Sequence, residues 1–565
     1  MTANTAKLTG EVVRPGDAGY EAARLGWNRL YSSHPQAIVF CIDTQDAINA
    51  LAWARQNDIP VRARSGRHCL EGWSGVDDGL VIDVSHMKSA EIDAASNTAT
   101  VGAGLNQLEA VIALGKAGFA APTGSEGTVG LVGATLGGGF GLLTRNYGMA
   151  SDNLVAAEVV VASADGGATA IIADEENNSD LLWALRGAGN GNFGIVTALT
   201  YKIHPLTQTI HLGATWPGLD DLQGVFGAWQ RTAPHLDNRL TSQIEVHRDE
   251  IVLIAVLASG PEAEATQMLE PILSIGQPHV TTKDANWADN YAGLQIPSDE
   301  EPANWKFFSQ FISEPFPPEA VGVIGSLMAK APTSECNYMT NAFGGAVKSS
   351  EPSGGSAFAH RDALFYAEPG AGWGSRAGVL GSDDPLTATC LSWIADFAEA
   401  LRPYVNGAYS NVPNAGMPGW ETAYWGPNVD RLRAIKAKYD PQNVFSFDQS
   451  LPLVSGCARC VRSVACESLV GEQRPVVAAI ARTRCRRRGR GTAAPVFCPA
   501  SVPAVRGGHA QRRHGVRLRL RRIHVRDPGH FLQQLVVGSD QRCRRQGADG
   551  RRDRAAAGRG PHRVR

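Results

Sequence analysis

The first 206 residues alternate short apolar runs with amphipathic segments, a pattern typical of strands connected by helices. Four of the apolar runs predict buried strands, at residues 37–41, 59–64, 80–84 and 98–102. A helix is expected after the first strand, with Thr44 as its N-cap and its end near Asn57. A second helix is expected from Leu105 to about Lys116, where apolar residues recur every three or four positions. These segments predict a domain that mixes α and β structure.

A β-hairpin is expected next. Apolar strands at 154–162 and 168–172 flank a turn at Asp165-Gly166, whose residue types favour chain reversal. A helix around 181–183 and a strand at 195–203 follow the hairpin. The alternation of strands and helices therefore continues to the end of that last strand.

The pattern changes near Pro205. Residues 207–406 mix helices with strands such as 251–257, and glycine motifs become sparse. Aromatic residues are frequent in this region: Trp216, Trp229, Trp287, Trp305, Phe307, Phe308, Phe365, Tyr366 and Trp373. Two interpretations of these side chains stay open, namely packing in a hydrophobic core and a face that binds a substrate.

Two short stretches carry candidate chemistry. The first is Arg64-Ser-Gly-Arg-His-Cys69, where Gly66 is expected to permit a turn with dihedrals closed to other residues. Successive backbone N–H groups in such a turn form a nest for an anion such as pyrophosphate. His68 ends the nest with a neutral imidazole that can act as nucleophile or ligand, and a structural histidine is the alternative.

The second stretch is a glycine-rich loop, Gly124 to Gly141, that contains eight glycines. Its backbone is expected to approach a large flat ligand closely, since side chains are missing there. Gly137–Gly141 and Gly187–Gly194 also resemble a dinucleotide fingerprint. That fingerprint requires a strand, GxGxxG and a helix in order, and neither stretch has this context. We therefore do not expect a fold of the NAD-binding type.

Composition divides the chain in two. The apolar fraction of 43% and charged fraction of 19% are those of a globular protein. The formal net charge of −2 conceals +20 on residues 455–565, which hold 26 Arg and no Lys, and −22 on residues 1–454. The Arg-rich tail is either a basic arm for nucleic acid or an out-of-frame reading of a GC-rich gene. We expect the second, hence an unfolded tail and no nucleic-acid partner.

The cysteines and the N-terminal sequence indicate the cellular compartment of the protein. Four scattered cysteines precede the tail, without the spacing of a metal site or a disulfide framework. The N-terminus has no apolar segment of signal-peptide length, and no apolar run approaches the roughly 20 residues of a membrane span. We expect a cytoplasmic protein without a membrane partner and without a metal.

Several motifs in a fixed order carry a resemblance to a known family. They are Arg64-Ser-Gly-Arg-His68, Gly79-Leu-Val-Ile-Asp83, Val129-Gly-Leu-Val-Gly133, Gly137-Gly-Gly-Phe-Gly141, Tyr147-Gly-Met-Ala-Ser-Asp-Asn153, Trp183-Ala-Leu-Arg-Gly187, Asn192-Phe-Gly-Ile-Val196 and Asp440-Pro-Gln-Asn-Val-Phe445. With these motifs, residues 10–452 resemble the berberine-bridge-enzyme-like FAD-linked oxidases. That group belongs to the vanillyl-alcohol oxidase superfamily, which has a PCMH-type FAD-binding domain.

The resemblance implies an α+β fold with a PCMH-type FAD-binding domain of two subdomains and an α+β substrate domain. The implied boundaries are 1–206 for the FAD-binding domain, 207–406 for the substrate domain, 407–452 for a return segment that completes the FAD-binding domain, and 453–565 for the tail. It also implies FAD bound covalently through His68. The implied cofactor-binding residues are Arg64, Ser65, Gly66, Arg67, His68, Cys69, Val129, Gly130, Leu131, Val132, Gly133, Ala134, Phe140, Ile195 and Asn443.

The chain departs from the family pattern at three positions. Glu126 stands where some members carry a cysteine that forms a second flavin bond, and Ala134 stands where a histidine often follows the paired glycines. Val412 stands where the family has its catalytic tyrosine. Glu126, Tyr409 and Tyr366 are the candidate replacements for that base, with a structural role as the alternative for each.

The implied activity is hydride removal from a small organic substrate by FAD, with O2 as the electron acceptor and H2O2 as product. Val129 lies beside the flavin in this family, and its short side chain is expected to leave a void through which O2 can approach the flavin. Two alternatives stay open, a dehydrogenase with another acceptor and a flavoprotein that has lost catalysis.

Overall fold

The computed structural model describes residues 6–297 and 300–453. The predictions for the Arg-rich tail beyond residue 453 therefore lie outside the described residues. Among the helices that are described, none is long and apolar enough to cross a membrane.

The chain begins with a four-stranded sheet in the order β1-β2-β4-β3. Its strands are β1 (Glu11–Val13), β2 (Ala37–Phe40), β3 (Val61–Arg64) and β4 (Leu80–Asp83), and β2, β4 and β3 run parallel. Short α1 (Tyr20–Arg24) precedes β2, and α2 (Thr44–Gln56) connects β2 to β3. The N-cap of α2 is Asp43 rather than the predicted Thr44, because the Asp43 carboxylate accepts the N–H of Asp46.

A second, antiparallel sheet has the order β5-β6-β10-β8-β9. Its strands are β5 (Ala90–Asp93), β6 (Thr98–Gly102), β8 (Leu154–Ala162), β9 (Ala168–Ala173) and β10 (Ile195–Lys202), which confirms the predicted hairpin. Helices α3 (Gln107–Lys116), α5 (Thr144–Tyr147) and α6 (Ser179–Ala188) and the two-stranded pair β7 (Phe119–Ala120) and β11 (His204–Pro205) accompany it. Helix α3 begins two residues after the predicted Leu105, since Asn106 and Glu109 form a capping box.

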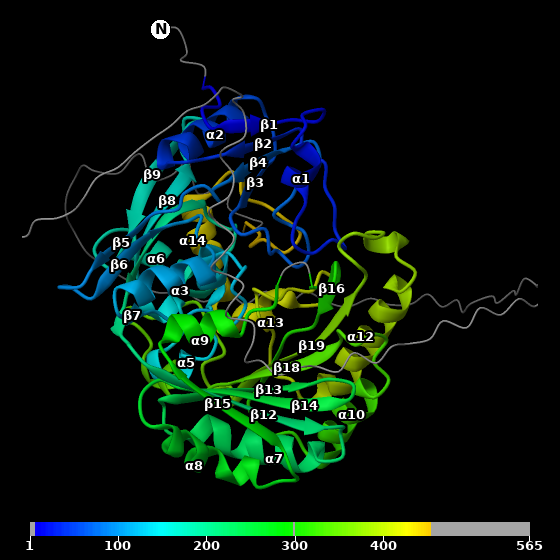
Figure 1. The fold of residues 1–565 in the computed structure, drawn as a ribbon. Coiled ribbons are helices and arrows are strands. Elements are labelled where there is room, and N and C mark those ends of the chain that lie inside the picture. The colour runs from blue at the N-terminus through cyan, green and yellow to red at the C-terminus, as the bar shows by residue number, and fades with distance from the viewer. Residues whose placement is uncertain (1–5, 298–299, 454–565) are drawn as a thin grey trace, which may run out of the picture. The chain divides into compact units, whose positions relative to one another are not determined.

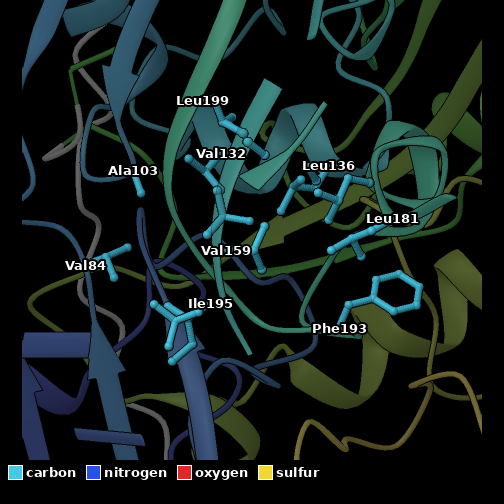
Figure 2. Packing of buried hydrophobic residues seen from close by; sticks show 14 of the residues in the cluster. Val84, Ala103, Val132, Leu136, Val159, Leu181, Phe193, Ile195 and Leu199 are labelled. Atoms are coloured by element: carbon cyan, nitrogen blue, oxygen red, sulfur yellow. The ribbon is translucent and has the colours of Figure 1, made fainter. Parts of the chain in front are cut away.

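One helix lies where a loop was expected. Residues Leu131–Gly137 form α4, inside the stretch that the glycine content marked as a loop. Figure 2 shows the reason, because Val132 and Leu136 of α4 point into the same buried cluster as Leu181, Ile195 and Leu199. Burial of these aliphatic side chains stabilises the helix in spite of its glycines.

A third sheet of eight strands spans the middle of the chain, in the order β15-β12-β14-β13-β18-β19-β16 with β17 also paired to β19. Its strands are β12 (Thr209–Pro217), β13 (Leu240–Val246), β14 (Glu250–Leu257), β15 (His279–Ala285), β16 (Asn304–Phe307), β17 (Gln310–Ile312), β18 (Asn337–Ala342) and β19 (Phe365–Trp373). Helices α7 (Leu222–Thr232), α8 (Glu262–Leu273), α10 (Pro318–Met328) and α12 (Thr387–Leu401) lie against it (Figure 1). Shorter α9 (Trp287–Gly293) and α11 (Ala346–Ser349) lie between strands in sequence.

The structure decides between the two interpretations for four of the aromatic residues of this region. Trp216, Trp229, Phe365 and Trp373 are buried in the core between the sheet and its helices, so the core interpretation is confirmed for them. Tyr366 alternates with Phe365 along β19 and points to the opposite face of the sheet. That opposite face carries the chemistry described below.

The return segment packs on the first domain through α13 (Trp420–Trp425) and α14 (Val429–Tyr439). A buried ion pair anchors its end, in which the Lys436 ammonium lies 2.6 Å from the Asp440 carboxylate. The same ammonium donates to the carbonyls of Asn192 and Phe445, so the pair is fully hydrogen-bonded. These bonds connect the Asp440-Pro-Gln-Asn turn to the loop before β10.

Candidate functional site

A cavity of about 570 Å³ lies between the first domain and the third sheet. The predicted cofactor residues that line it are Arg64, Ser65, Gly66, Arg67, His68, Cys69, Val129, Gly130, Val132, Gly133, Ala134, Phe140 and Ile195. Leu131 and Asn443 are not among the residues that line it, so their assignment to cofactor binding stays a prediction. Leu131 is buried in the hydrophobic core, and Asn443 forms a turn at a φ of 54°, with its N–H donated to the Asp440 carbonyl.

We call residues 64–69 and 124–141 the loop wall of this cavity. The Arg64 guanidinium faces away from the cavity, in a buried ion pair 2.7 Å from Asp83. The left-handed residue of the turn is Arg67, at a φ of 62°, and not Gly66 as predicted. Gly66 is required for another reason, because a Cβ there would lie 2.2 Å from the backbone nitrogen of Gly130. The two halves of the loop wall therefore meet through their backbones.

The backbone N–H groups of the turn are the next feature of the loop wall. Within the described part of the chain, the backbone N–H groups of Ser65, Gly66, Arg67 and His68 donate to no other residue. Such a series of unpaired N–H groups is the donor set that an anion nest needs. The turn thus fits the pyrophosphate of a dinucleotide.

His68 lies at the end of this turn, and its ring is held on two sides. Trp27 stacks on it with ring centroids 4.7 Å apart, and its Nε2 lies 2.9 Å from the Thr128 hydroxyl. Burial, together with the charge of Arg376, lowers the pKa of His68 to about 3. The imidazole is therefore neutral at physiological pH and retains a lone pair for nucleophilic attack or coordination.

The cavity also contains space that a flat ligand can fill. Gly133 lies on the cavity side of α4, and a Cβ at this position would meet no atom within 4 Å. Among the residues that the structure describes, the buried side-chain atoms Asn190 Oδ1 and Arg62 Nε find no hydrogen-bond partner, although both residues line the cavity. Unpartnered buried polar atoms beside open space indicate a polar ligand. The residues present therefore fit a flavin dinucleotide.

The opposite side is formed by three neighbouring strands, β13, β18 and β19. The sheet register aligns Glu245, Met339 and Glu368 in one row across them. Side chains two residues along form a second row, and the six together, which we call the sheet wall, are Gln243, Glu245, Met339, Asn341, Tyr366 and Glu368. This wall carries two carboxyl groups, one hydroxyl and two amides toward the ligand space.

Glu368 is the most perturbed acid of the sheet wall. Its side chain accepts a hydrogen bond from the Tyr366 hydroxyl, and the residue is 8% exposed. Burial raises the pKa of Glu368, the hydrogen bond from Tyr366 lowers it and the nearby Glu245 raises it, so that together they bring it to about 7. A carboxyl with this pKa exchanges protons near neutrality. Sequence analysis did not identify it, although a Glu within the otherwise apolar Phe365–Trp373 strand is a visible anomaly.

The predicted candidate Tyr409 lies on the third side of the cavity. Its hydroxyl oxygen accepts the N–H of Gly139 at 2.8 Å and the side-chain amide of Asn411 at 2.6 Å. Both lone pairs are therefore used, and the hydroxyl proton is left to donate. Burial raises the pKa of Tyr409 and of Tyr366 above the usual value. Both stay protonated near neutral pH and are suited to donate hydrogen bonds.

The structure also places the three positions at which the sequence departs from the family pattern. Val412 lines the cavity near the sheet wall, with its carbonyl bonded to the Ser309 hydroxyl. Ala134 and Glu126 line the cavity as well. The Glu126 carboxylate accepts both the N–H and the hydroxyl of Thr128, at 3.0 and 2.7 Å. Glu126 therefore contacts the loop that holds His68.

Comparisons with known proteins agree with this site. Residues 35–168 match the family model of an FAD binding domain, and residues 408–452 match the model described as berberine and berberine like. The uncharacterized FAD-linked oxidoreductase YgaK of Bacillus subtilis is 38% identical over 449 residues, which cover 79% of this chain and 97% of that protein. The (R)-6-hydroxynicotine oxidase of Paenarthrobacter nicotinovorans is 32% identical over 255 residues, which cover 44% of this chain and 55% of that protein.

A solved structure extends the agreement to the fold. BBE-like 1 of Physcomitrella patens superposes with a TM-score of 0.72 at 28% identity, over 80% of this chain and 98% of that one. The similarity thus includes both the FAD-binding domain and the eight-stranded third sheet. With a 38% identical relative aligned over nearly its whole length and both family models matched, the chain belongs to the berberine-bridge-enzyme-like FAD-linked oxidoreductases.

Proposed function

We propose that this FAD-linked oxidoreductase is an oxidase, which removes a hydride from a C–H bond of a small organic substrate and passes the electrons to O2, giving H2O2. The substrate carries a hydroxyl or amine on the carbon that is oxidised. The observation that carries the proposal is Glu368, a buried carboxyl with a pKa of about 7 that faces the loop wall across one cavity. A poised base opposite a cofactor site is what such an oxidation requires.

The cofactor end of the cavity belongs to the loop wall. The Ser65–His68 turn would hold the pyrophosphate, while Gly133, Ala134 and Ile195 would lie against the rings. When bound there, FAD supplies a two-electron acceptor for the hydride. The protein has to bind the substrate, orient it and move its proton.

Proton removal is assigned to Glu368. As the ionised carboxylate it takes the proton of the substrate hydroxyl or amine while the C–H bond breaks. The hydrogen bond from Tyr366 orients the carboxylate and stabilises its charge. Tyr409, with both lone pairs occupied, donates its proton to a substrate oxygen or nitrogen. None of the three candidates from the sequence is needed as the base.

Covalent attachment of FAD through His68 alone is part of the proposal. The neutral buried imidazole next to the nest supports His68 as the nucleophile. Glu126 stands where a second anchor would need a cysteine, and a carboxylate forms no thioether. A tethered flavin cannot dissociate from the oxidase between turnovers.

Two further parts of the proposal, O2 as the electron acceptor and a small molecule as the substrate, are supported by different observations. Val129 lines the cavity on the loop wall, and its short branched side chain leaves space that a longer one fills. One relative is named as an oxidase of (R)-6-hydroxynicotine, a small organic molecule. We extend this substrate size, and not that compound, to the present protein.

The test begins with a panel of small alcohols and amines, read by peroxide formation. With a substrate found, Glu368→Gln is expected to lower the rate of anaerobic flavin reduction by about 10²- to 10⁴-fold, with flavin content unchanged. Glu245→Gln is the matched control, since it removes the other carboxylate of the same row. Flavin reduction in Glu368→Gln at the wild-type rate would refute the base, and substrate oxidation without peroxide would indicate a dehydrogenase.

A further inference from the structure

Three side chains of the loop wall form a continuous hydrogen-bonded series that substrate oxidation does not use. Glu126 Oε1 lies 2.7 Å from the Thr128 hydroxyl oxygen, which lies 2.9 Å from His68 Nε2. The Thr128 N–H also donates to the same carboxylate oxygen, at 3.0 Å. The Glu126 backbone is held in turn, because the Gln107 side chain donates to its carbonyl at 2.7 Å.

Donor counting assigns the protons in this series. A carboxylate only accepts hydrogen bonds, so the single hydroxyl proton of Thr128 points to Glu126. The Thr128 oxygen must then accept from His68, and the ring proton lies on Nε2. The lone pair of the neutral imidazole is therefore on Nδ1. Trp27, stacked at an interplanar angle of 22°, keeps the ring in this orientation.

We propose that Glu126 and Thr128 are positioning residues for flavin attachment, which hold His68 in the Nε2–H tautomer and take up the Nε2 proton when Nδ1 is alkylated. This inference rests on the proposed attachment through His68. It also assigns Glu126 to cofactor attachment rather than to substrate oxidation. The low pKa of His68 agrees with it, because burial disfavours a cationic ring that would have no lone pair to offer.

The attachment step balances with the acceptor already named. A bond forms between His68 Nδ1 and the 8α carbon of the flavin, and one C–H bond of that methyl group breaks. Two electrons pass to the flavin ring and then to O2. The methyl group releases one proton, and the His68 Nε2 proton leaves through the Thr128 hydroxyl to Glu126. These two released protons balance the two that O2 takes up on becoming H2O2. Without this path the alkylated ring would keep its Nε2 proton and would therefore carry a positive charge in a buried site.

The experiment measures two quantities in the purified full-length protein, total FAD and the fraction that remains on the protein after acid precipitation. Thr128→Val and Glu126→Gln keep the side-chain shapes and remove the hydroxyl and the charge. Each is expected to reduce the covalent fraction at least severalfold while total FAD and the melting temperature stay near wild type. Thr128→Ser restores the hydroxyl and is expected to restore the covalent fraction.

A matched control distinguishes the relay from loss of a buried hydroxyl in general. Thr123→Val makes the same change at a buried threonine close in sequence that does not line the cavity, and it should leave the covalent fraction unchanged. Wild-type covalent fractions in both Thr128→Val and Glu126→Gln would overturn the relay and leave the attachment through His68 intact. Complete release of flavin from the wild type would overturn the attachment and the relay together.

Discussion

The two walls of the cavity are built in different ways. The loop wall is made of two continuous stretches, 64–69 and 124–141, which contribute backbone groups, His68 and side chains close to each other in sequence. The sheet wall consists of six single side chains from three strands that are distant in sequence. A site made of consecutive residues leaves a motif in the sequence. A site made by strand register leaves only isolated residues.

Burial also acts in opposite directions on the principal titratable group of each wall. Desolvation lowers the pKa of His68 to about 3 and raises that of Glu368 to about 7. In both cases the neutral form is favoured. His68 is then neutral throughout the physiological range, whereas Glu368 changes its charge within that range. We therefore expect the loop wall to be insensitive to pH and the sheet wall to set the pH dependence of catalysis.

The largest expected effect concerns the loop wall. His68→Ala should abolish acid-stable flavin, because it removes the only proposed nucleophile. Cys69→Ala is the control, and it should keep all covalent flavin because burial raises the pKa of that thiol and keeps it protonated. Flavin retained on acid-precipitated His68→Ala protein would show that another residue is the anchor.

Substitutions at two glycines of the loop wall should have different effects, one on cofactor binding and the other on the stability of the fold. Gly133→Leu fills open cavity space, so FAD content should fall strongly while the melting temperature is maintained or rises. Gly66→Ala forces a Cβ against Gly130, so it should destabilise the fold by about 1–3 kcal/mol or more. FAD content and thermal unfolding measure the two effects. Normal FAD content in Gly133→Leu would show that the cofactor does not occupy that space.

The pH dependence of flavin reduction tests the sheet wall. Only ionised Glu368 accepts a proton, so the rate should reach a plateau above about pH 7 and fall about tenfold per pH unit below it. Tyr366→Phe removes a hydrogen bond that lowers the pKa of Glu368, so the profile should move to higher pH. Anaerobic stopped-flow reduction measures both profiles. A flat profile between about pH 5 and pH 9 would contradict the role of Glu368.

A smaller effect is expected at Val129. Val129→Leu should slow reoxidation of the reduced flavin by air severalfold, because the added methylene fills space beside the cofactor. Flavin attachment and the anaerobic reduction rate should stay unchanged, and rapid mixing with aerated buffer measures the reoxidation. Reduced wild-type flavin that persists for minutes in air would instead favour the dehydrogenase alternative.

The smallest expected effect is that of the Arg-rich tail. The two walls, as defined above, consist of residues within the described ranges 6–297 and 300–453. The YgaK relative is also covered to 97% of its length by 79% of this chain. Deletion of 455–565 should therefore leave flavin content and the melting temperature unchanged. A marked fall in melting temperature would show that the tail contributes to the stability of the body.

The order of strands and helices in the FAD-binding domain could be predicted because burial imposes a period on each segment. The strands 37–40 and 98–102 and the hairpin 154–173 agree with their predictions almost to the residue. His68 and its turn were visible for the same local reason, since a nest and its histidine are neighbours in sequence. Helix α4 was missed because its stability comes from Val132 and Leu136 in a distant core, which outweighs the helix propensity of its glycines.

By itself, the sequence determined the family and the FAD cofactor, and it named the candidate nucleophile His68, because each depends on contiguous residues. Only the tertiary structure decided that Gly66 is needed for contact with Gly130, that Glu126 reaches His68 through Thr128, and that Glu368 faces the cavity. These relations depend on strand register and on loops that meet across the fold. Burial, which raises the pKa of Glu368, is likewise a property of the folded chain, so the sequence could mark this Glu as unusual in an apolar strand but could not give its pKa.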